Sequence, residues 1–185
     1  MPHHKHGFTI IEVSLVLAIA GLILVMAFVA LPALQRQTRD SKRKEDTMTF
    51  LQALKKYQQN NRGQLPKVEN DLEDRQYSNY SILRNNTDAE RWNSNNNPWA
   101  AFYNKYLGDS FTNPEGEKYS FLIQILLNAW YDYDSIMANG FDNRAADFYI
   151  FMEAICENGR PTESNNSRNL AIVTPLESGT YCANL

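Results

Sequence analysis

One continuous apolar segment close to the amino terminus limits what this chain can fold into. Residues 13–34 hold no charged side chain, whereas 21% of the whole 185-residue chain is charged. A helix of this length spans roughly 33 Å at about 1.5 Å per residue, which matches the hydrocarbon core of a bilayer. The segment therefore predicts a membrane-spanning helix, with most of the remaining chain outside the membrane.

Three kinds of segment compete for this run: a cleaved secretory signal, a plain signal anchor, and a segment that uses the polar residue at its edge. A secretory signal has an apolar region of about 7–15 residues followed by small residues at the cleavage site. Here the small residues Ala18 and Ala20 lie in the middle of the run, with apolar sequence continuing beyond them, so a secretory signal fits poorly. A plain anchor does not explain Glu12, because a charge inside a membrane segment costs roughly 2.5–3.5 kcal/mol. Taken alone, Glu12 is compatible both with an interfacial position and with a functional partner.

The residues around Glu12 carry a resemblance to a known family. Residues 5–13 read Lys-His-Gly-Phe-Thr-Ile-Ile-Glu-Val, which resembles the type IV prepilin signal. In that signal a short charged leader ends in glycine, a phenylalanine follows, and a glutamate stands fifth after the cleavage point. The resemblance implies that prepilin peptidase cuts between Gly7 and Phe8, removes a leader of residues 1–7, and methylates the new amine on Phe8.

The same resemblance implies a role for Glu12 in assembly. Cleavage leaves a cationic amine on Phe8, and inside a filament core the Glu12 carboxylate of one subunit can meet that amine on a neighbour. Either charge alone would be costly in a low-dielectric core, and the pair offsets much of that cost. We therefore expect Glu12 to set the register between stacked helices.

Helical periodicity continues beyond the membrane segment. Apolar residues recur at helical spacing over residues 48–57, and Gly63 followed by Pro66 predicts the end of the helix. The sequence thus predicts one long helix over residues 8–62, apolar on all sides in its first half and amphipathic in its second. Its last residues also resemble the exit of the pilin helix into the globular head.

Residues 63–185 are expected to form this head. A short helix is predicted over residues 98–107, with an aromatic stripe that we interpret as core. Alternation of apolar residues predicts four strands, over residues 119–127, 148–156, 170–174 and 176–182. No element is predicted in the polar stretch 67–97. The predicted class is α+β and pilin-like: a long N-terminal helix, transmembrane in its first half, packed on a small antiparallel β-sheet.

A turn is predicted where Asn113-Pro114-Glu115-Gly116 precedes Tyr119. This segment resembles a divergent form of the Asp-Pro-x-Gly-x-x-Tyr segment of pilin-like proteins of secretion systems, with Asn113 in place of the aspartate.

The two cysteines, Cys156 and Cys182, are expected to form a structural disulfide that clamps the C-terminal segment to the head. Neither has metal-binding spacing, and distant cysteines behind a membrane-targeting segment favour a disulfide. Two free thiols are the alternative.

The chain offers little for catalysis or metal binding. All three histidines lie in the predicted leader, so the mature chain could build no Ser-His-Asp triad and no histidine-bound metal site. The acidic residues of segment 132–147 lack EF-hand spacing and are interpreted as a solvated loop, with calcium binding left open. We expect a protein that is not an enzyme, with no catalytic residue, cofactor or metal.

Charge argues against a nucleic-acid-binding surface. The formal net charge is -3, from 18 Lys+Arg and 21 Asp+Glu. The basic cluster in residues 36–44 is interpreted as a solvated helix face or an interfacial anchor.

These observations predict a structural subunit of a type IV pilus, a filament class that serves adhesion or twitching motility. The expected precursor is a single-pass protein of the cytoplasmic membrane, and the assembled filament is extracellular. Its expected partners are other pilins, in a homo- or heteropolymer, prepilin peptidase, the pilus assembly machinery and the membrane. Two alternatives stay open: a pseudopilin of a type II secretion or DNA-uptake system, and a signal-anchored surface protein that does not polymerise.

Overall fold

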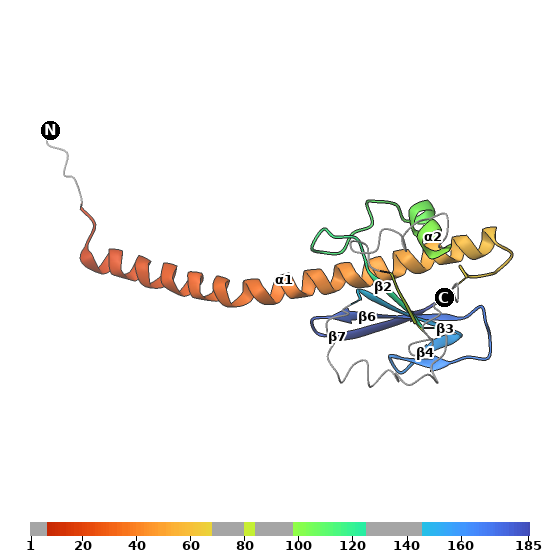
Figure 1. Ribbon diagram of the computed structural model, residues 1–185. Coiled ribbons are helices and arrows are strands. Elements are labelled where there is room, and N and C mark those ends of the chain that lie inside the picture. Colours follow the sequence, from red (N-terminus) through yellow and green to blue (C-terminus); the bar gives the residue numbers. More distant parts are fainter. Residues whose placement is uncertain (1–6, 68–79, 84–97, 125–145) are drawn as a thin grey trace. The chain divides into compact units, whose positions relative to one another are not determined.

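The computed structural model describes residues 7–67, 80–83, 98–124 and 146–185 and divides the chain into two compact units (Figure 1). The first unit is residues 1–39 and the second is residues 40–185. The α+β class is confirmed, because one long helix is followed by strands that form a sheet.

The long helix α1 spans Ile10–Asn60, so the predicted N-terminal helix is confirmed. Its last turn closes where the Gly63 amide donates a 2.7 Å hydrogen bond to the carbonyl of Gln58. Arg62 and Gly63 both have positive φ, 56° and 77°, which turns the chain out of the helix. Glycine at the second of these positions has no Cβ to resist that conformation.

The second unit contains a five-stranded sheet in the order β1-β2-β3-β6-β7. The strands are β1 (Tyr80–Leu83), β2 (Phe121–Gln124), β3 (Phe148–Met152), β6 (Leu170–Leu176) and β7 (Gly179–Asn184). All neighbours pair antiparallel except β2 and β3, which run parallel, so the sheet is mixed. Parallel pairing needs a connection of about a dozen residues or more, and residues 125–147 provide the length for it.

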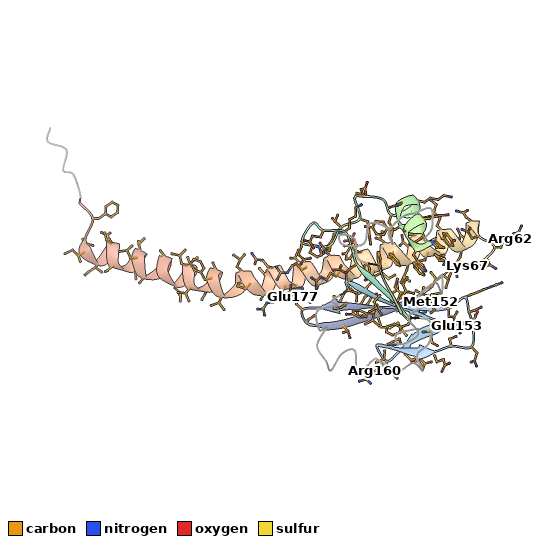
Figure 2. The ribbon with its side chains drawn as sticks, viewed as in Figure 1. Arg62, Lys67, Met152, Glu153, Arg160 and Glu177 are labelled. Carbon is orange, nitrogen blue, oxygen red and sulfur yellow. A yellow bond between two sulfur atoms is a disulfide. The ribbon has the colours of Figure 1, made fainter. Side chains whose placement is uncertain are left out.

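The predicted strand 148–156 is divided in two. Glu153 adopts a positive φ of 55° and separates β3 from β4 (Ala154–Glu157) (Figure 2). Its amide donates to the carbonyl of Asn169, and its carbonyl accepts from the amide of Ser164. The chain then turns back through Asn158-Gly159, both at positive φ, into β5 (Arg160–Glu163). Asn-Gly at positive φ is the preferred sequence of a two-residue hairpin turn.

Two apolar cores lie on opposite faces of the sheet. One face packs on the second half of α1 and on α2 (Pro98–Tyr106), whereas β4 covers the other face (Figure 1). Phe50 of α1 lies at the centre of the first core. The centroid of its ring is 5.2–5.5 Å from the ring centroids of aromatic residues in α2 and the sheet. The aromatic stripe of α2 is buried there, so its interpretation as core is confirmed.

Other boundaries differ from the predictions. Strand β1 lies inside the polar stretch 67–97, where no element was expected. Strand β2 begins at Phe121 rather than at 119, and the predicted continuation beyond Gln124 lies outside the described residues. The final hairpin runs further than expected, with β6 reaching Leu176 and β7 reaching Asn184.

Candidate functional site

The first unit presents its apolar side chains to the surroundings. Residues 7–38 are all exposed, and the large apolar side chains from Phe8 to Leu34 are between 48% and 89% exposed. The helix is long and apolar enough to cross a membrane. Such a continuous apolar surface on a chain in water would drive association, so this segment needs lipid or other apolar helices around it.

The bond between Gly7 and Phe8 lies just before the helix. Residues 7–9 are not helical, and α1 begins at Ile10. A Cβ added to Gly7 would meet no atom within 4 Å, and Phe8 is 89% exposed. A peptide bond that is exposed and outside regular secondary structure is accessible to a protease.

Glu12 and Thr9 together cap the start of α1. The Thr9 amide and hydroxyl donate hydrogen bonds of 2.9 and 2.8 Å to Glu12 Oε2, and the Glu12 amide donates a 3.3 Å bond to Thr9 Oγ1. This is a capping box, in which the side chains of the N-cap and of the residue three positions later satisfy each other's backbone donors. Both bonds from Thr9 end on Oε2, so Glu12 Oε1 keeps its capacity to accept.

The structure therefore brings Glu12 to Thr9, and no hydrogen bond joins Glu12 to Phe8 among the described residues. Sequence reasoning did not single out Thr9. The signal was present, because Thr-x-x-Glu before an apolar run is the sequence pattern of a capping box.

In the second unit, Asp40 ties α1 to the hairpin between β6 and β7. Its carboxylate is 6% exposed and accepts from the Glu177 amide (2.8 Å), the Ser178 amide (3.2 Å) and the Ser178 hydroxyl (2.6 Å). Burial raises the pKa of this carboxyl, but these donors and nearby Arg43 lower it more, so its net pKa is below the ordinary value. Asp40 is thus held as a charged acceptor.

A second buried carboxylate, Asp46, lies two turns further along α1. Lys42 Nζ is 2.5 Å from Asp46 Oδ1, and the Tyr119 hydroxyl donates to Asp46 Oδ2. Burial, and then the bond to Asp46, raises the pKa of Tyr119. Residues 36–44 were interpreted as a solvated face or an anchor. Lys42 and Lys44 of this cluster are exposed, although Lys42 also pairs with the buried Asp46. Asp40, which lies between the basic residues, is instead buried and serves the packing of the second unit.

The predicted turn at Asn113 contacts the same stretch of α1. Asn113 Oδ1 accepts from the amides of Glu115 (3.2 Å) and Glu117 (2.8 Å), which closes the turn around its own side chain. Arg43 Nη2 lies 3.2 Å from Glu115 Oε1. An asparagine oxygen therefore fulfils the acceptor role that an aspartate would have at this position.

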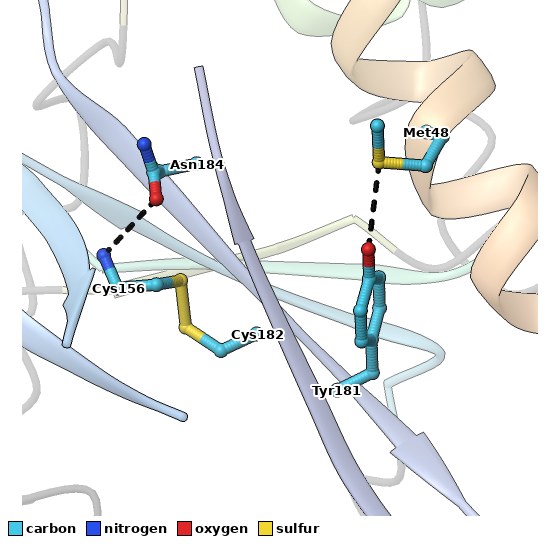
Figure 3. The surroundings of a disulfide bond; sticks show 5 residues. All are labelled: Met48, Cys156, Tyr181, Cys182 and Asn184. Atoms are coloured by element: carbon cyan, nitrogen blue, oxygen red, sulfur yellow. Dashed lines mark hydrogen bonds between the residues drawn. A yellow bond between two sulfur atoms is a disulfide. The ribbon is translucent and has the colours of Figure 1, made fainter. Parts of the chain in front are cut away.

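Cys156 and Cys182 form a disulfide, with a Cα–Cα distance of 5.9 Å (Figure 3). The bond joins β4 to β7, and Asn184 Oδ1 accepts a 3.4 Å hydrogen bond from the Cys156 amide. On the same strand Tyr181 points to the other side, where its hydroxyl faces Met48 of α1 (Figure 3). β7 is thereby tied to elements on both faces of the sheet.

Most of the acidic segment 132–147 lies outside the described residues. Asp147 is described, and its Oδ2 accepts from both the amide and the hydroxyl of Ser120, at 2.8 Å each. Among the residues that the structure describes, no group of three or more His, Cys, Asp or Glu side chains could hold a metal ion.

Comparison with known proteins identifies the amino-terminal segment. No curated protein and no solved structure matches the chain. Residues 2–28 match the model of the prokaryotic N-terminal methylation motif. The matched range contains Gly7, Phe8 and Glu12 and the first turns of the exposed apolar helix. The chain therefore begins with the class III signal typical of type IV pilins and pseudopilins, followed by a pilin-like α+β fold.

Proposed function

We propose that this chain is a structural subunit of a type IV pilus that polymerises through its N-terminal helix. The exposed apolar stretch of α1, directly behind the matched motif, carries the proposal. Before assembly, lipid would cover this surface. In a filament, the equivalent helices of neighbouring subunits would cover it, so that the same side chains serve both states.

The proposed maturation begins with cleavage after Gly7 by prepilin peptidase and methylation of the new Phe8 amine. The proposed organisation is a leader of residues 1–7, a long helix of residues 8–62 with the transmembrane segment 13–34, and a globular head of residues 63–185. The exposed, non-helical backbone at residues 7–9 supports access by a peptidase.

The proposed assembly contact pairs Glu12 of one subunit with the Phe8 amine of its neighbour. The capping box supports it, because Thr9 fixes the Glu12 carboxylate at the start of the helix while Oε1 can still accept. A preorganised carboxylate loses less freedom on binding an amine than a mobile one.

The proposed location is the cytoplasmic membrane for the precursor and the extracellular filament for the mature subunit. The proposed partners are other pilins, prepilin peptidase, the assembly machinery and the membrane. Adhesion or twitching motility is the proposed use of the filament.

Mass spectrometry of filaments sheared from the source cells tests the proposal. The expected result is a chain that starts at Phe8, carries one added methyl group on its amine, and is present in the sheared fraction. A chain that keeps residues 1–7 and stays in the membrane fraction would instead identify the non-polymerising anchored protein.

A pseudopilin is the second candidate. It is favoured by the segment from Asn113 to Tyr119, which resembles a segment of pilin-like proteins of secretion systems. Asn113 closes the turn of this segment, and Tyr119 bonds to Asp46 of α1. Deletion of the gene separates the candidates. Loss of surface filaments with normal protein export supports the pilus, whereas loss of export without loss of surface filaments supports the pseudopilus.

A further inference from the structure

A surface cavity of about 400 Å³ lies where α1 ends and α2 begins. This volume is within the range of about 300–1,000 Å³ that is usual for sites of small organic ligands. Its lining residues are Tyr57, Asn60, Asn61, Arg62, Gln64, Leu65, Lys67 and Pro98. None of these residues belongs to the processing or assembly site described above.

The cavity is positively charged. Arg62 and Lys67 are both exposed and follow the end of α1 (Figure 2), and none of the described residues that line the cavity is acidic. A third cation, Arg168, lies near the cavity without lining it: its guanidinium carbon would lie 3.6 Å from a Cβ placed on Gly63, which stands between the lining residues Arg62 and Gln64. Within the described part of the chain, no ion pair neutralises any of these three cations.

Two carboxamides of the cavity are held in place. Asn60 Nδ2 donates a 3.1 Å hydrogen bond to the Tyr106 hydroxyl, and Asn61 Nδ2 donates a 2.8 Å bond to the carbonyl of Tyr57. Each amide keeps its Oδ1 acceptor and a second N–H donor. Gln64, which is exposed, adds a third carboxamide.

The remaining lining is apolar. Tyr57 and Pro98 are half-buried, and Leu65 is 9% exposed. These groups offer a ring face and a hydrocarbon surface beside the polar groups. The cavity thus combines cations, paired donors and acceptors, and apolar surface.

We propose that this cavity binds an acidic sugar, that is, a saccharide unit with a carboxylate. The cations match the carboxylate through charge-assisted hydrogen bonds. The carboxamides match hydroxyl groups, which both donate and accept. The apolar lining matches the C–H face of the sugar ring. The volume exceeds what phosphate or sulfate needs, and the net charge of -3 argues against a nucleic-acid backbone as the ligand.

Saturation-transfer NMR on the full chain in detergent micelles tests the site, with sodium glucuronate, glucose and sodium sulfate as probes. We expect transfer to glucuronate, much weaker transfer to glucose, and no displacement of glucuronate by an equal concentration of sulfate. Glucuronate should bind at least about tenfold more weakly to the Arg62→Asn and Lys67→Gln variants, because each removes a charged partner. Asparagine tolerates the positive φ at position 62.

Lys56→Gln is the matched control, because Lys56 is an exposed cation of α1 outside the cavity. It should bind glucuronate as the parent does. Absence of transfer in the parent, equal transfer to glucose, or displacement by sulfate would each overturn the proposal. The proposal would also be overturned if the Arg62→Asn and Lys67→Gln variants lost thermal stability but kept glucuronate binding. The two cations would then only stabilise the C-terminal end of α1, where its carbonyl groups carry partial negative charge.

A linear glucuronate trimer separates the two sources of such a sugar. Tighter binding than the monomer indicates a polysaccharide chain, and equal binding indicates a single terminal or free sugar; both results support the site. The measurement is made on single chains in detergent, so its outcome is independent of whether the chain forms filaments.

Discussion

The Tyr119 hydroxyl donates a 2.5 Å hydrogen bond to Asp46 Oδ2 inside the second unit. The other carboxylate oxygen is paired with Lys42, which reaches it from one turn earlier on α1. A buried carboxylate is costly unless it is paired and hydrogen-bonded, and here both oxygens have a partner. The contact therefore fixes the segment before β2 to one position along the helix.

Replacing Tyr119 by phenylalanine tests the weight of this bond. The variant keeps the ring but leaves Asp46 Oδ2 without its donor, so we expect a loss of about 1.5–3 kcal/mol in the free energy of unfolding. Urea unfolding in detergent, followed by near-ultraviolet circular dichroism, measures it. Tyr181→Phe is the control, because its hydroxyl makes only a 3.5 Å contact with Met48 at the surface. Equal stability of the parent and Tyr119→Phe would contradict the assignment.

High pH should destabilise the second unit through its buried tyrosines. Burial, with nearby Asp109 and Asp147, raises the pKa of Tyr103 from 10.0 to about 12, while its hydroxyl donates to the carbonyl of Phe111. A raised pKa means that the contribution is fully present below about pH 10 and is lost as pH rises toward 12. Unfolding experiments across this window should show falling stability. The decline should be less steep in Tyr103→Phe, and an unchanged slope would count against this cause.

Some of this structure could be predicted from local sequence and some could not. The long helix, α2 and β6 follow from periodicity and end signals in their own residues. The break at Glu153 could not be predicted, because glutamate rarely adopts a positive φ and its amide and carbonyl are held by Asn169 and Ser164, which are distant in sequence. Parallel pairing of β2 with β3 is likewise a property of the tertiary fold.

The candidate site shows the same division. Gly7, Phe8 and Glu12 are recognisable because their spacing is local. Asp40 and Asp46 are not, because they lie in a charged stretch that resembles a solvated helix face. Only the fold brings Ser178 and Tyr119 to them, and only then does their burial become favourable.

Asp40→Asn tests the connection between α1 and the β6–β7 hairpin. The asparagine NH2 group would face donors at Ser178, so we expect a loss of about 1.5–3 kcal/mol and faster hydrogen exchange at the amides of Glu177 and Ser178. Since the pKa of Asp40 is lowered, its contribution is present above the ordinary value of 3.8 and is lost as pH falls through the lower, folded-state value. Glu45→Gln, an exposed carboxylate on the same helix, should change neither quantity.

Removing the disulfide should loosen the C-terminal part of the second unit. Cys156 and Cys182 are 26 residues apart, and closing a loop of this size is worth about 3–4 kcal/mol in the chain-entropy model. The Cys156→Ser/Cys182→Ser double variant should lose about this much stability, and limited proteolysis should cut within residues 157–185 while α1 stays intact. Asn184→Ala, which removes only a 3.4 Å hydrogen bond, is the control. Two reactive thiols in the denatured, unreduced parent would disprove the bond.

Glu12 has two separable roles, as a cap within its own chain and as the proposed partner of a neighbouring Phe8 amine. Glu12→Ala removes both, whereas Thr9→Val removes the hydroxyl of the capping box and keeps the carboxylate. We expect both variants to insert into the membrane, since neither adds a charge. Glu12→Ala should yield few or no sheared filaments, because the Phe8 amine would enter the filament core without a counter-charge.

Thr9→Val should keep filaments, in reduced amount, because the carboxylate remains but is less well positioned. The amount of protein in the sheared fraction, divided by the amount in the membrane fraction, measures assembly. If both variants lower this ratio equally, capping alone explains the need for Glu12. If Glu12→Ala assembles as well as the parent, the carboxylate has no part in the filament contact.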